Sequence, residues 1–439
     1  MTADLEFPRG SGAHRAPLQQ TDLLPSGNCI QEAVRGMLLV EREVRKEISG
    51  IQVFLGLSSH NSPSLCLRSL FALVVFAAVC SPERPAQAAE GPRAKEIAAI
   101  FRPLVGHQEP GLAVLVRLNG RTMFKRGYGR RDLRSGALIN AHSNFRLASC
   151  TKQFTALAVM LLVQDGKLRL DDRLTDMFPE FPAYGRTITI RNLLNHTSGL
   201  VAYEDLMDRM YAGKPWQEIP QISDAAVLQL MAQQTATKFP PGSAWEYSNS
   251  GYCVLARVVE KASGLSFADF LHQRIFVPLK MHATVAYENG KNAVQARAYG
   301  YTKDAGLWLE TDQSPTSATL GDGGIYSSLD DLSKWDDALR HPTPLNDAAL
   351  RLALAAVALP QDSRLRPEAP RSLPIKYGFG WFLDPYRGHA RMWHYGASIG
   401  FRTLIERFPA DRLTILILAN RTDLDPAALA LRVADLYLH

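Results

Sequence analysis

Two stretches near opposite ends of the chain alternate between apolar and polar residues, and each contains a turn signal. Residues 112–128 alternate around Asn119-Gly120, a pair in which both residues accept the positive φ angles of a tight hairpin turn. Residues 401–420 form a second alternating pattern that turns at Pro409-Ala410-Asp411. Alternation with a period of two indicates strands that bury one face. We therefore expect one sheet assembled from both ends of the chain.

Helical patterns fill the sequence between the two hairpins, where apolar residues recur every three or four positions. Glycine follows two of these segments closely, at Gly166 and Gly264, as is common just after a helix. The predicted helices are 149–165, 251–262, 330–340 and Pro426 to Leu438, and a short strand is predicted at Gly378 to Leu383.

These patterns predict an α/β (α+β) fold in which helices flank an antiparallel sheet and a helical lobe is inserted between its halves. We expect the sheet lobe at about 95–145 and 315–439, and the helical lobe at about 146–314. The active site is expected between the two lobes.

Composition supports a globular protein and excludes several other classes. The 439 residues are 46% hydrophobic and 21% charged, with 31 glycines and 26 prolines, which fits neither a disordered nor a collagen-like chain. The formal charge of +6 is spread thinly, without a dense run of lysine and arginine. Nucleic acid is therefore not an expected partner.

A short apolar run near the N-terminus predicts export. Residues 70–79, LFALVVFAAV, follow Arg68 and are only ten residues long, whereas a membrane-spanning helix needs about 20. Ala86-Gln87-Ala88 offers a small-x-small cleavage site just before Ala89. We predict a signal peptide at 65–88, a periplasmic or secreted mature protein at 89–439, and no stable membrane span.

The 64 residues upstream of this signal are not expected in an exported protein, because signal peptides start close to their apolar run. We interpret 1–64 as a doubtful extension, with the true start at Met37 or near Leu65. The alternative is a real cytosolic extension followed by a buried helix at 70–80. Of the five cysteines, only Cys150 and Cys253 lie beyond this region, and we expect both to be buried free thiols.

The first chemical motif is Ser149-Cys150-Thr151-Lys152, at the start of the first long helix. A spacing of three places Ser149 Oγ and Lys152 Nζ on one helix face. A serine hydroxyl needs a neighbouring base, and a lysine can serve if burial lowers its pKa. Only Lys152, among thirteen lysines, has a serine three residues before it. The structural alternative is a helix-capping serine beside a solvated lysine.

Two further motifs follow in order. Tyr247-Ser248-Asn249 lies before a predicted helix, where the tyrosine could act as a base and the asparagine could hold a substrate amide. The same pattern recurs at Tyr287-Glu288-Asn289, so it is not specific alone. His394-Tyr395-Gly396 is the only His-x-Gly in the chain, and we expect it on the edge strand of the sheet beside the site.

Taken together, the three motifs resemble Ser-x-x-Lys, Tyr-x-Asn and Lys/His-x-Gly of the serine β-lactamase-related family, which includes class C β-lactamases, D-Ala-D-Ala carboxypeptidases and family VIII-type esterases. Four further stretches resemble the same family and lie at 162–174, 188–200, 239–252 and 321–335. The resemblance runs from about residue 95 to the C-terminus. It implies a β-lactamase/penicillin-binding-protein-like fold and no metal or organic cofactor.

The resemblance also implies catalytic roles. Ser149 would be the acylated nucleophile, and Lys152 and Tyr247 would share the proton transfers, without the sequence deciding which is the base. The backbone N–H groups of Ser149 and Ala397 would form the oxyanion hole.

Substrate binding is implied for Asn249, His394 and Gly396. Asn249 would orient the substrate or Lys152, His394 would replace a cation or donor, and Gly396 would let the substrate backbone approach. Family β-lactamases usually carry Lys-Thr-Gly or Lys-Ser-Gly at this third motif, whereas a histidine is mostly neutral at pH 7. We therefore rank an exported serine hydrolase of small esters, amides or D-amino-acid-containing peptides, including peptides derived from the cell wall, above a class C β-lactamase.

Two alternatives remain. A non-catalytic, peptidoglycan-binding relative is expected to lose one catalytic group, yet all of these groups are present. Gly396-Ala397-Ser398-Ile399-Gly400 matches the Gly-x-Ser-x-Gly nucleophile elbow of α/β-hydrolases, which needs a helix directly after it. The sequence from Phe401 alternates like a strand instead. His196, in Asn-His-Thr-Ser-Gly-Leu, is expected to be structural and near the site.

The export hypothesis predicts that the mature protein begins at Ala89. N-terminal sequencing of protein recovered from its native compartment measures this directly. A mature N-terminus upstream of Leu65 would contradict export through this signal.

Overall fold

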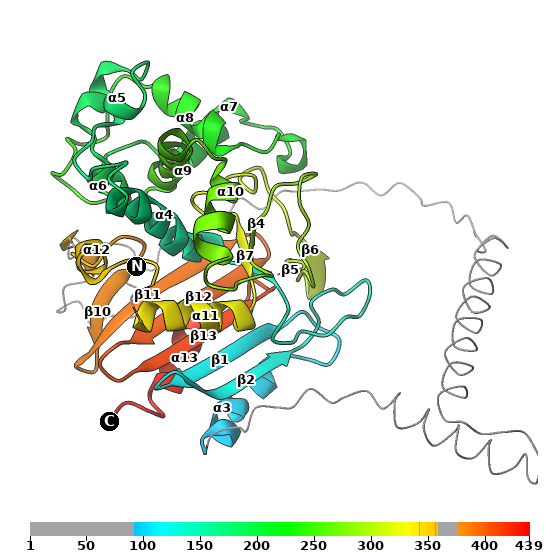
Figure 1. Ribbon diagram of the computed structural model, residues 1–439. Helices are drawn as coiled ribbons and strands as arrows, with labels where there is room; N and C mark the ends of the chain where they lie inside the picture. The colour runs from blue at the N-terminus through cyan, green and yellow to red at the C-terminus, as the bar shows by residue number, and fades with distance from the viewer. Residues whose placement is uncertain (1–91, 342, 356, 359–375) are drawn as a thin grey trace, which may run out of the picture. The chain divides into compact units, whose positions relative to one another are not determined.

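The computed structural model describes residues 92–439 apart from 342, 356 and 359–375 (Figure 1). The doubtful extension and the predicted signal peptide lie outside the described residues. The described residues fall in one compact unit. Within them, no helix combines the length and apolar character needed to cross a membrane.

The largest sheet in the described residues has eight strands in the order β2-β1-β13-β12-β11-β10-β9-β8 (Figure 1). All neighbouring strands are antiparallel. The predicted sheet from both chain ends is confirmed, because β1 lies between β2 and β13. The strands are β1 (Leu112–Leu118), β2 (Arg121–Tyr128), β8 (Val357–Ala358), β9 (Lys376–Tyr377), β10 (Phe382–Tyr386), β11 (His389–Ser398), β12 (Phe401–Phe408) and β13 (Leu413–Ala419).

Two smaller sheets complete the strands. β7 lies between two short strands in the first, and a hairpin forms the second. Their members are β3 (Phe145–Arg146), β4 (Val285–Ala286) and β7 (Ile325–Ser327), and β5 (Tyr301–Asp304) with β6 (Leu307–Glu310).

Both predicted hairpins are present. Asn119 and Gly120 have φ angles of 52° and 77°, as a tight turn between β1 and β2 requires. The second hairpin joins β12 to β13 at 409–412, where Arg412 has a φ of 54°.

The helices lie on both faces of the large sheet and in a group beside it (Figure 1). They are α3 (Ala94–Phe101), α4 (Lys152–Gln164), α5 (Leu174–Met177), α6 (Ile190–Leu194), α7 (Tyr203–Met210), α8 (Asp224–Ala232), α9 (Asn249–Ser263), α10 (Phe267–Leu271), α11 (Leu329–Arg340), α12 (Asp347–Ala353) and α13 (Pro426–Ala434). Short 3-10 helices are η1 (Arg102–Leu104), η2 (Ala148–Thr151), η3 (Ala183–Thr187) and η4 (Trp216–Glu218), and η5 (His272–Phe276) is a π-helix.

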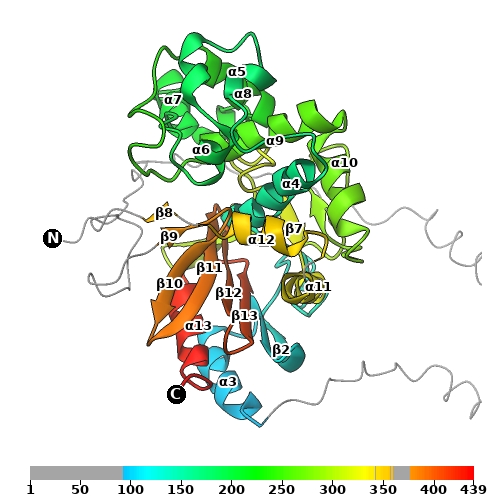
Figure 2. The ribbon, with the colours of Figure 1, turned by 60° about the vertical axis from the view of Figure 1, so that its left-hand side comes forward.

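The strands divide their side chains between two cores. Leu112 and Val114 of β1 belong to a core with α3 and α13, whereas Ala113 and Leu115 belong to the core that contains α4, α9 and α11. Figure 2 shows α3 and α13 on one side of the sheet and α11 on the other. Because both faces are covered, β1 and β13 are almost continuously apolar.

Two sequence predictions about the last strands are wrong. The strand predicted at Gly378 to Leu383 is displaced to β10, because Gly380 has a φ of 78° and the chain turns there between β9 and β10. β11, which carries His394, is not the edge strand, because β10, β9 and β8 follow it. Its ladder with β10 covers only His389 to Trp393, so His394 and the residues after it extend beyond β10.

A buried charge network fastens α11 to the large sheet. The Asp336 side chain is 2% exposed and accepts hydrogen bonds from Arg117 (2.8 Å), Arg407 (3.0 Å), Arg340 (3.0 Å) and Thr414 (2.7 Å). Burial by itself would raise the pKa of Asp336, but Arg407 and the other donors hold it below its usual value.

We predict that Asp336→Ala lowers the free energy of unfolding by about 3–5 kcal/mol, because it leaves buried arginines without their partner. Urea unfolding at neutral pH measures the loss. Because the folded-state pKa of Asp336 is depressed, its contribution is present above the unfolded pKa near about 4 and is lost as pH falls through the folded pKa.

The matched control is Asp337→Ala on the same helix. Asp337 is 51% exposed and contacts Arg117 at 2.7 Å, so we expect a loss below about 1 kcal/mol. Equal losses in the two variants would contradict the special role of Asp336.

Candidate active site

The backbone before Ser149 is held in an unusual conformation. Ser149 lies in η2 and precedes α4, rather than lying inside the long helix predicted from the sequence. Ala148 has a φ of 47°, which costs energy for a residue with a side chain. Leu147 anchors this turn, because its N–H donates to Ile325 O (2.8 Å) and its carbonyl accepts from Thr403 Oγ1 (2.7 Å). Ser149 itself remains partly exposed.

Lys152 is completely buried and contacts three oxygen atoms. Its Nζ lies 3.1 Å from Ser149 Oγ, 2.8 Å from Asn249 Oδ1 and 2.9 Å from the backbone O of Asp322. Burial lowers the pKa of Lys152, and the Asp322 carboxylate opposes that shift. The structure therefore brings together the first motif and the asparagine of the second.

The three partners suit a neutral as well as a charged amine. Asn249 Oδ1 and Asp322 O can only accept hydrogen bonds, whereas the Ser149 hydroxyl can also donate. A neutral Lys152 has two hydrogens, and the two carbonyl oxygens take both. Its lone pair then faces the Ser149 hydroxyl, which is the arrangement a general base requires.

Tyr247 lies beside this amine. Lys152 Nζ is 4.9 Å from the centre of the Tyr247 ring, and that ring stacks on Phe382 at 6.5 Å. Burial raises the pKa of Tyr247, against the lowering effect of a hydrogen bond with Ser149. Tyr247 therefore carries its proton in the resting protein and offers the site a hydrogen-bond donor.

His196 contacts the second motif through a hydrogen bond and a ring contact. It is fully buried with a φ of 63°, and its Nδ1 accepts the backbone N–H of Ser248 at 3.1 Å. Its ring lies 4.4 Å from the Tyr247 ring. The predicted structural role near the site agrees with this placement.

His394 is buried and neutral. It is 1% exposed, and burial together with Lys152 lowers its pKa to about 3. Its Nδ1 bonds the carbonyl of Tyr395 at 2.8 Å, so Nε2 accepts from the Tyr377 hydroxyl at 3.2 Å. His394 thus lies beside the site without supplying the positive charge of a family lysine.

Gly396 lets β11 lie directly against the turn at Leu147-Ala148-Ser149. A Cβ at this position would come within 2.2 Å of both Leu147 O and Thr403 Oγ1. The next residue, Ala397, is exposed at the end of the strand where β11 contacts η2. The oxyanion hole formed by the N–H groups of Ser149 and Ala397 stays a prediction that this packing permits.

Ser398 does not form a nucleophile elbow. It ends β11, and the chain turns at Gly400, with a φ of 76°, directly into β12. A strand–turn–strand unit lacks the helix that an elbow requires.

Two acidic residues at the site were missed from the sequence. Glu204 on α7 accepts the Asn249 amide N–H at 2.6 Å, and the Asp322 carboxylate accepts the Tyr203 hydroxyl at 3.2 Å. The only sequence feature that pointed to Asp322 was its place in a stretch that resembles the family. No sequence feature pointed to Glu204, because an acidic residue in the first turn of a helix is common.

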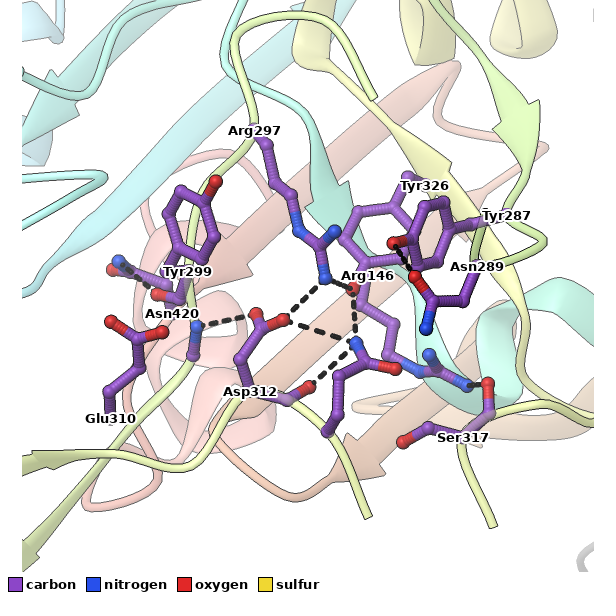
Figure 3. Close-up of polar contacts among 12 residues, drawn as sticks. Arg146, Tyr287, Asn289, Arg297, Tyr299, Glu310, Asp312, Ser317, Tyr326 and Asn420 are labelled. Atoms are coloured by element: carbon purple, nitrogen blue, oxygen red, sulfur yellow. Dashed lines mark hydrogen bonds and ion pairs between the residues drawn. The ribbon is translucent and has the colours of Figure 1, made fainter. Parts of the chain in front are cut away.

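The second Tyr-x-Asn belongs to a different cluster (Figure 3). The Tyr287 hydroxyl donates to Asn289 Oδ1 at 3.2 Å, and the Arg297 guanidinium lies 4.5 Å from the Tyr287 ring. Arg297 also forms an ion pair with Asp312 and donates to the Tyr326 hydroxyl at 3.1 Å. These contacts separate Tyr287 from the partners of Lys152.

Both cysteines of the described region are buried free thiols, as predicted. Cys150 Sγ donates to His394 O at 3.1 Å, and burial raises the pKa of Cys150 to about 12. Within the described residues, no group of three histidine, cysteine, aspartate or glutamate side chains is placed to hold a metal ion.

We predict that Gly396→Ala lowers the rate at which a reactive probe acylates Ser149 about 100-fold, because the added methyl forces β11 away from Leu147 and a shift of about 1 Å at the reacting atoms has that effect. The rate of Ser149 acylation by a reactive probe measures it.

The matched control is Gly323→Ala, whose Cβ would meet Ala148 at an ordinary 3.6 Å. This variant should react at nearly the original rate. A Gly396→Ala protein that folds normally and reacts as fast as the Gly323→Ala protein would refute the steric argument.

Comparison with known proteins places the chain in a family. A family model described as Beta-lactamase matches residues 97–438. Penicillin-binding protein 4* of Bacillus subtilis is 31% identical over 342 residues, which cover 75% of this chain and 72% of the relative. D-amino acid amidase from Ochrobactrum anthropi is 25% identical with a TM-score of 0.64, covering 78% of this chain and 97% of that one. EstCE1, a hydrolase with promiscuous acyltransferase activity, is 22% identical with a TM-score of 0.65, and the match covers 79% of this chain and 98% of EstCE1. At this identity, the likeness to EstCE1 shows the fold alone. The chain belongs to the serine β-lactamase-related family.

Proposed function

We propose that this protein is a serine hydrolase that forms an acyl-enzyme at Ser149 and acts on a small ester, amide or D-amino-acid-containing peptide. One observation carries the proposal. Ser149 Oγ lies 3.1 Å from the buried Nζ of Lys152, whose other two contacts are with carbonyl oxygens. This arrangement leaves the lone pair of a neutral Lys152 directed at the serine hydroxyl.

In the first step, Ser149 Oγ bonds to the carbonyl carbon of the substrate while its proton passes to Lys152. The carbonyl oxygen becomes negative, and the backbone N–H groups of Ser149 and Ala397 stabilise it. The bond to the leaving group then breaks, and the leaving group takes one proton, which passes from Lys152 by way of the Tyr247 hydroxyl next to Ser149, so that Tyr247 ends the step protonated.

In the second step, water attacks the acyl-enzyme. Its proton passes through the same groups to Ser149 Oγ, so that the ester bond breaks, a carboxylic acid leaves and the enzyme is restored. Each group returns to its starting protonation state. No metal or organic cofactor enters either step.

The surroundings of the third motif support an ester or amide substrate whose binding needs no positive charge from this motif. Because His394 is buried with a pKa of about 3, it offers no positive charge to a substrate carboxylate, which family β-lactamases bind through lysine. The amidase among the solved relatives supports the same substrate class. Class C β-lactamase activity is therefore the second candidate, and a non-catalytic wall-binding role ranks third because Ser149 and Lys152 are both in place.

Export belongs to the proposal as well. The apolar run at 70–79 and the cleavage signal before Ala89 support a periplasmic or secreted enzyme. Small molecules or peptides derived from the cell wall are the partners that such a location offers.

Labelling with a fluorophosphonate tests the mechanism without knowledge of the substrate. The Ser149 Oγ–P bond forms, the P–F bond breaks, fluoride leaves and the hydroxyl proton passes to Lys152. We expect a single adduct that peptide mapping locates on Ser149, and its absence in Ser149→Ala. Lys152→Ala should slow labelling about 1,000-fold, because general base assistance contributes roughly 100- to 10,000-fold. An adduct elsewhere, or none on the folded protein, would contradict the proposal.

A further inference from the structure

We propose that Glu204 is a positioning residue: by holding the Asn249 amide in one orientation, it directs the lone pair of Lys152 onto Ser149. The proposal rests on the serine hydrolase function proposed above and deepens it. It assigns a role to a residue outside the three motifs.

Hydrogen bonds between two helix starts place Glu204 beside Asn249. The backbone N–H of Tyr203 donates to Ser250 Oγ at 2.9 Å, and Ser250 Oγ donates to Val201 O at 2.7 Å. The start of α7 is therefore fastened to the start of α9. Glu204 Oε1 then lies 2.6 Å from Asn249 Nδ2, the shortest contact that this amide makes.

The two ends of the Asn249 side chain are chemically opposite. Its oxygen accepts from Lys152 Nζ at 2.8 Å, and its nitrogen donates to Glu204. An ionised carboxylate can only accept hydrogen bonds. While it is ionised, Glu204 permits one amide orientation, because the turned amide would place its oxygen against the carboxylate.

The orientation of the amide decides where the lone pair of Lys152 points. With Oδ1 facing Nζ, a neutral amine donates to Asn249 and to Asp322 O, and its lone pair faces Ser149. With Nδ2 facing Nζ, the amide would donate to that lone pair instead. Ser149 would then lose its base although every catalytic group was still present.

The Glu204 charge also acts on Lys152 electrostatically. Burial lowers the pKa of Lys152, and Asp322, Cys253 and Glu204 oppose that shift. Burial also raises the pKa of Glu204 itself, against its hydrogen bond with Asn249. The titratable groups that face Lys152 from the surrounding elements are Cys150, His196, Glu204, Tyr247, Tyr252, Cys253, Asp322 and His394. The Tyr203 hydroxyl in turn donates to the Asp322 carboxylate.

Two substitutions separate orientation from charge. Glu204→Gln removes the charge and keeps an oxygen that can accept from Asn249, so the productive amide orientation stays available although it is no longer enforced. Glu204→Met has nearly the same length and offers no acceptor. Asp205→Asn on the same helix is the matched control, because Asp205 is exposed and is the next residue along the chain. The readout is the second-order rate of fluorophosphonate labelling at Ser149, followed across the acid and neutral pH range.

We expect Glu204→Met to label about 10- to 100-fold more slowly than the unaltered protein, because a charge-assisted hydrogen bond that fixes the base is lost. Glu204→Gln should keep its plateau rate within about threefold. The acid limb of its pH profile should move to lower pH by about one unit, because removing a nearby negative charge lowers the pKa of Lys152. Asp205→Asn should match the unaltered protein in both rate and profile.

The outcomes distinguish this inference from the proposed function. If the unaltered protein labels at Ser149 and Glu204→Met labels equally fast with the same profile, the inference is overturned and the hydrolase function stands. If both Glu204 variants lose the same rate without a pH shift, Glu204 is merely structural and the inference is again overturned. If the unaltered protein gains no adduct on Ser149, the proposed function fails and the inference fails with it. Thermal unfolding establishes that each variant is folded, and Glu204→Gln alone decides the pH shift should Glu204→Met not fold.

Discussion

An amine without water around it needs a partner for each of its hydrogens, and the site is arranged around that need at Lys152. Burial makes the charged form of a lysine unfavourable, and an unpaired buried polar group is costly. The three contacts come from Ser149, Asn249 and Asp322, which lie on three distant segments of the chain. The start of α4, the start of α9 and the loop before β7 must therefore meet at one atom, and the nucleophile is placed by the same requirement.

Small residues on β11 and β12 allow the large sheet to pack against the turn that carries Ser149. Gly396 removes the side chain that would separate β11 from Leu147, and Thr403 on β12 bonds the Leu147 carbonyl. The strained φ of Ala148 persists because these contacts fix Leu147, the residue directly before it. Around them, the rings of His196, Tyr247 and His394 pack together and shield the Lys152 amine from solvent. Backbone packing thus helps the contacts of Lys152 to place the nucleophile, and the neighbouring rings bury the amine that would activate it.

Much of this architecture was predictable because it depends on local patterns. The period of two at 112–128 and the pair Asn119-Gly120 specify a hairpin by themselves, and the motif order identified the family before any contact was known. The errors arose where tertiary structure decides. A glycine at 380 with positive φ displaced the strand predicted over Gly378 to Leu383, and the pairing of β10 with β11, with β9 and β8 beyond it, places β11 inside the sheet. Glu204 was invisible because its role depends on a contact across 45 residues of sequence.

The pairing of β1 with β13 has a consequence for how the chain is made. Leu112 lies opposite Ala419, so β1, the first long strand of the described residues, finds its second neighbour only when β13 has emerged. Until then, β1 and β2 form a two-stranded hairpin that has α3 beside it but lacks β13, α13 and the rest of the sheet, and such ribbons are marginal in water. During synthesis, the incomplete sheet is therefore the part of this protein most exposed to aggregation.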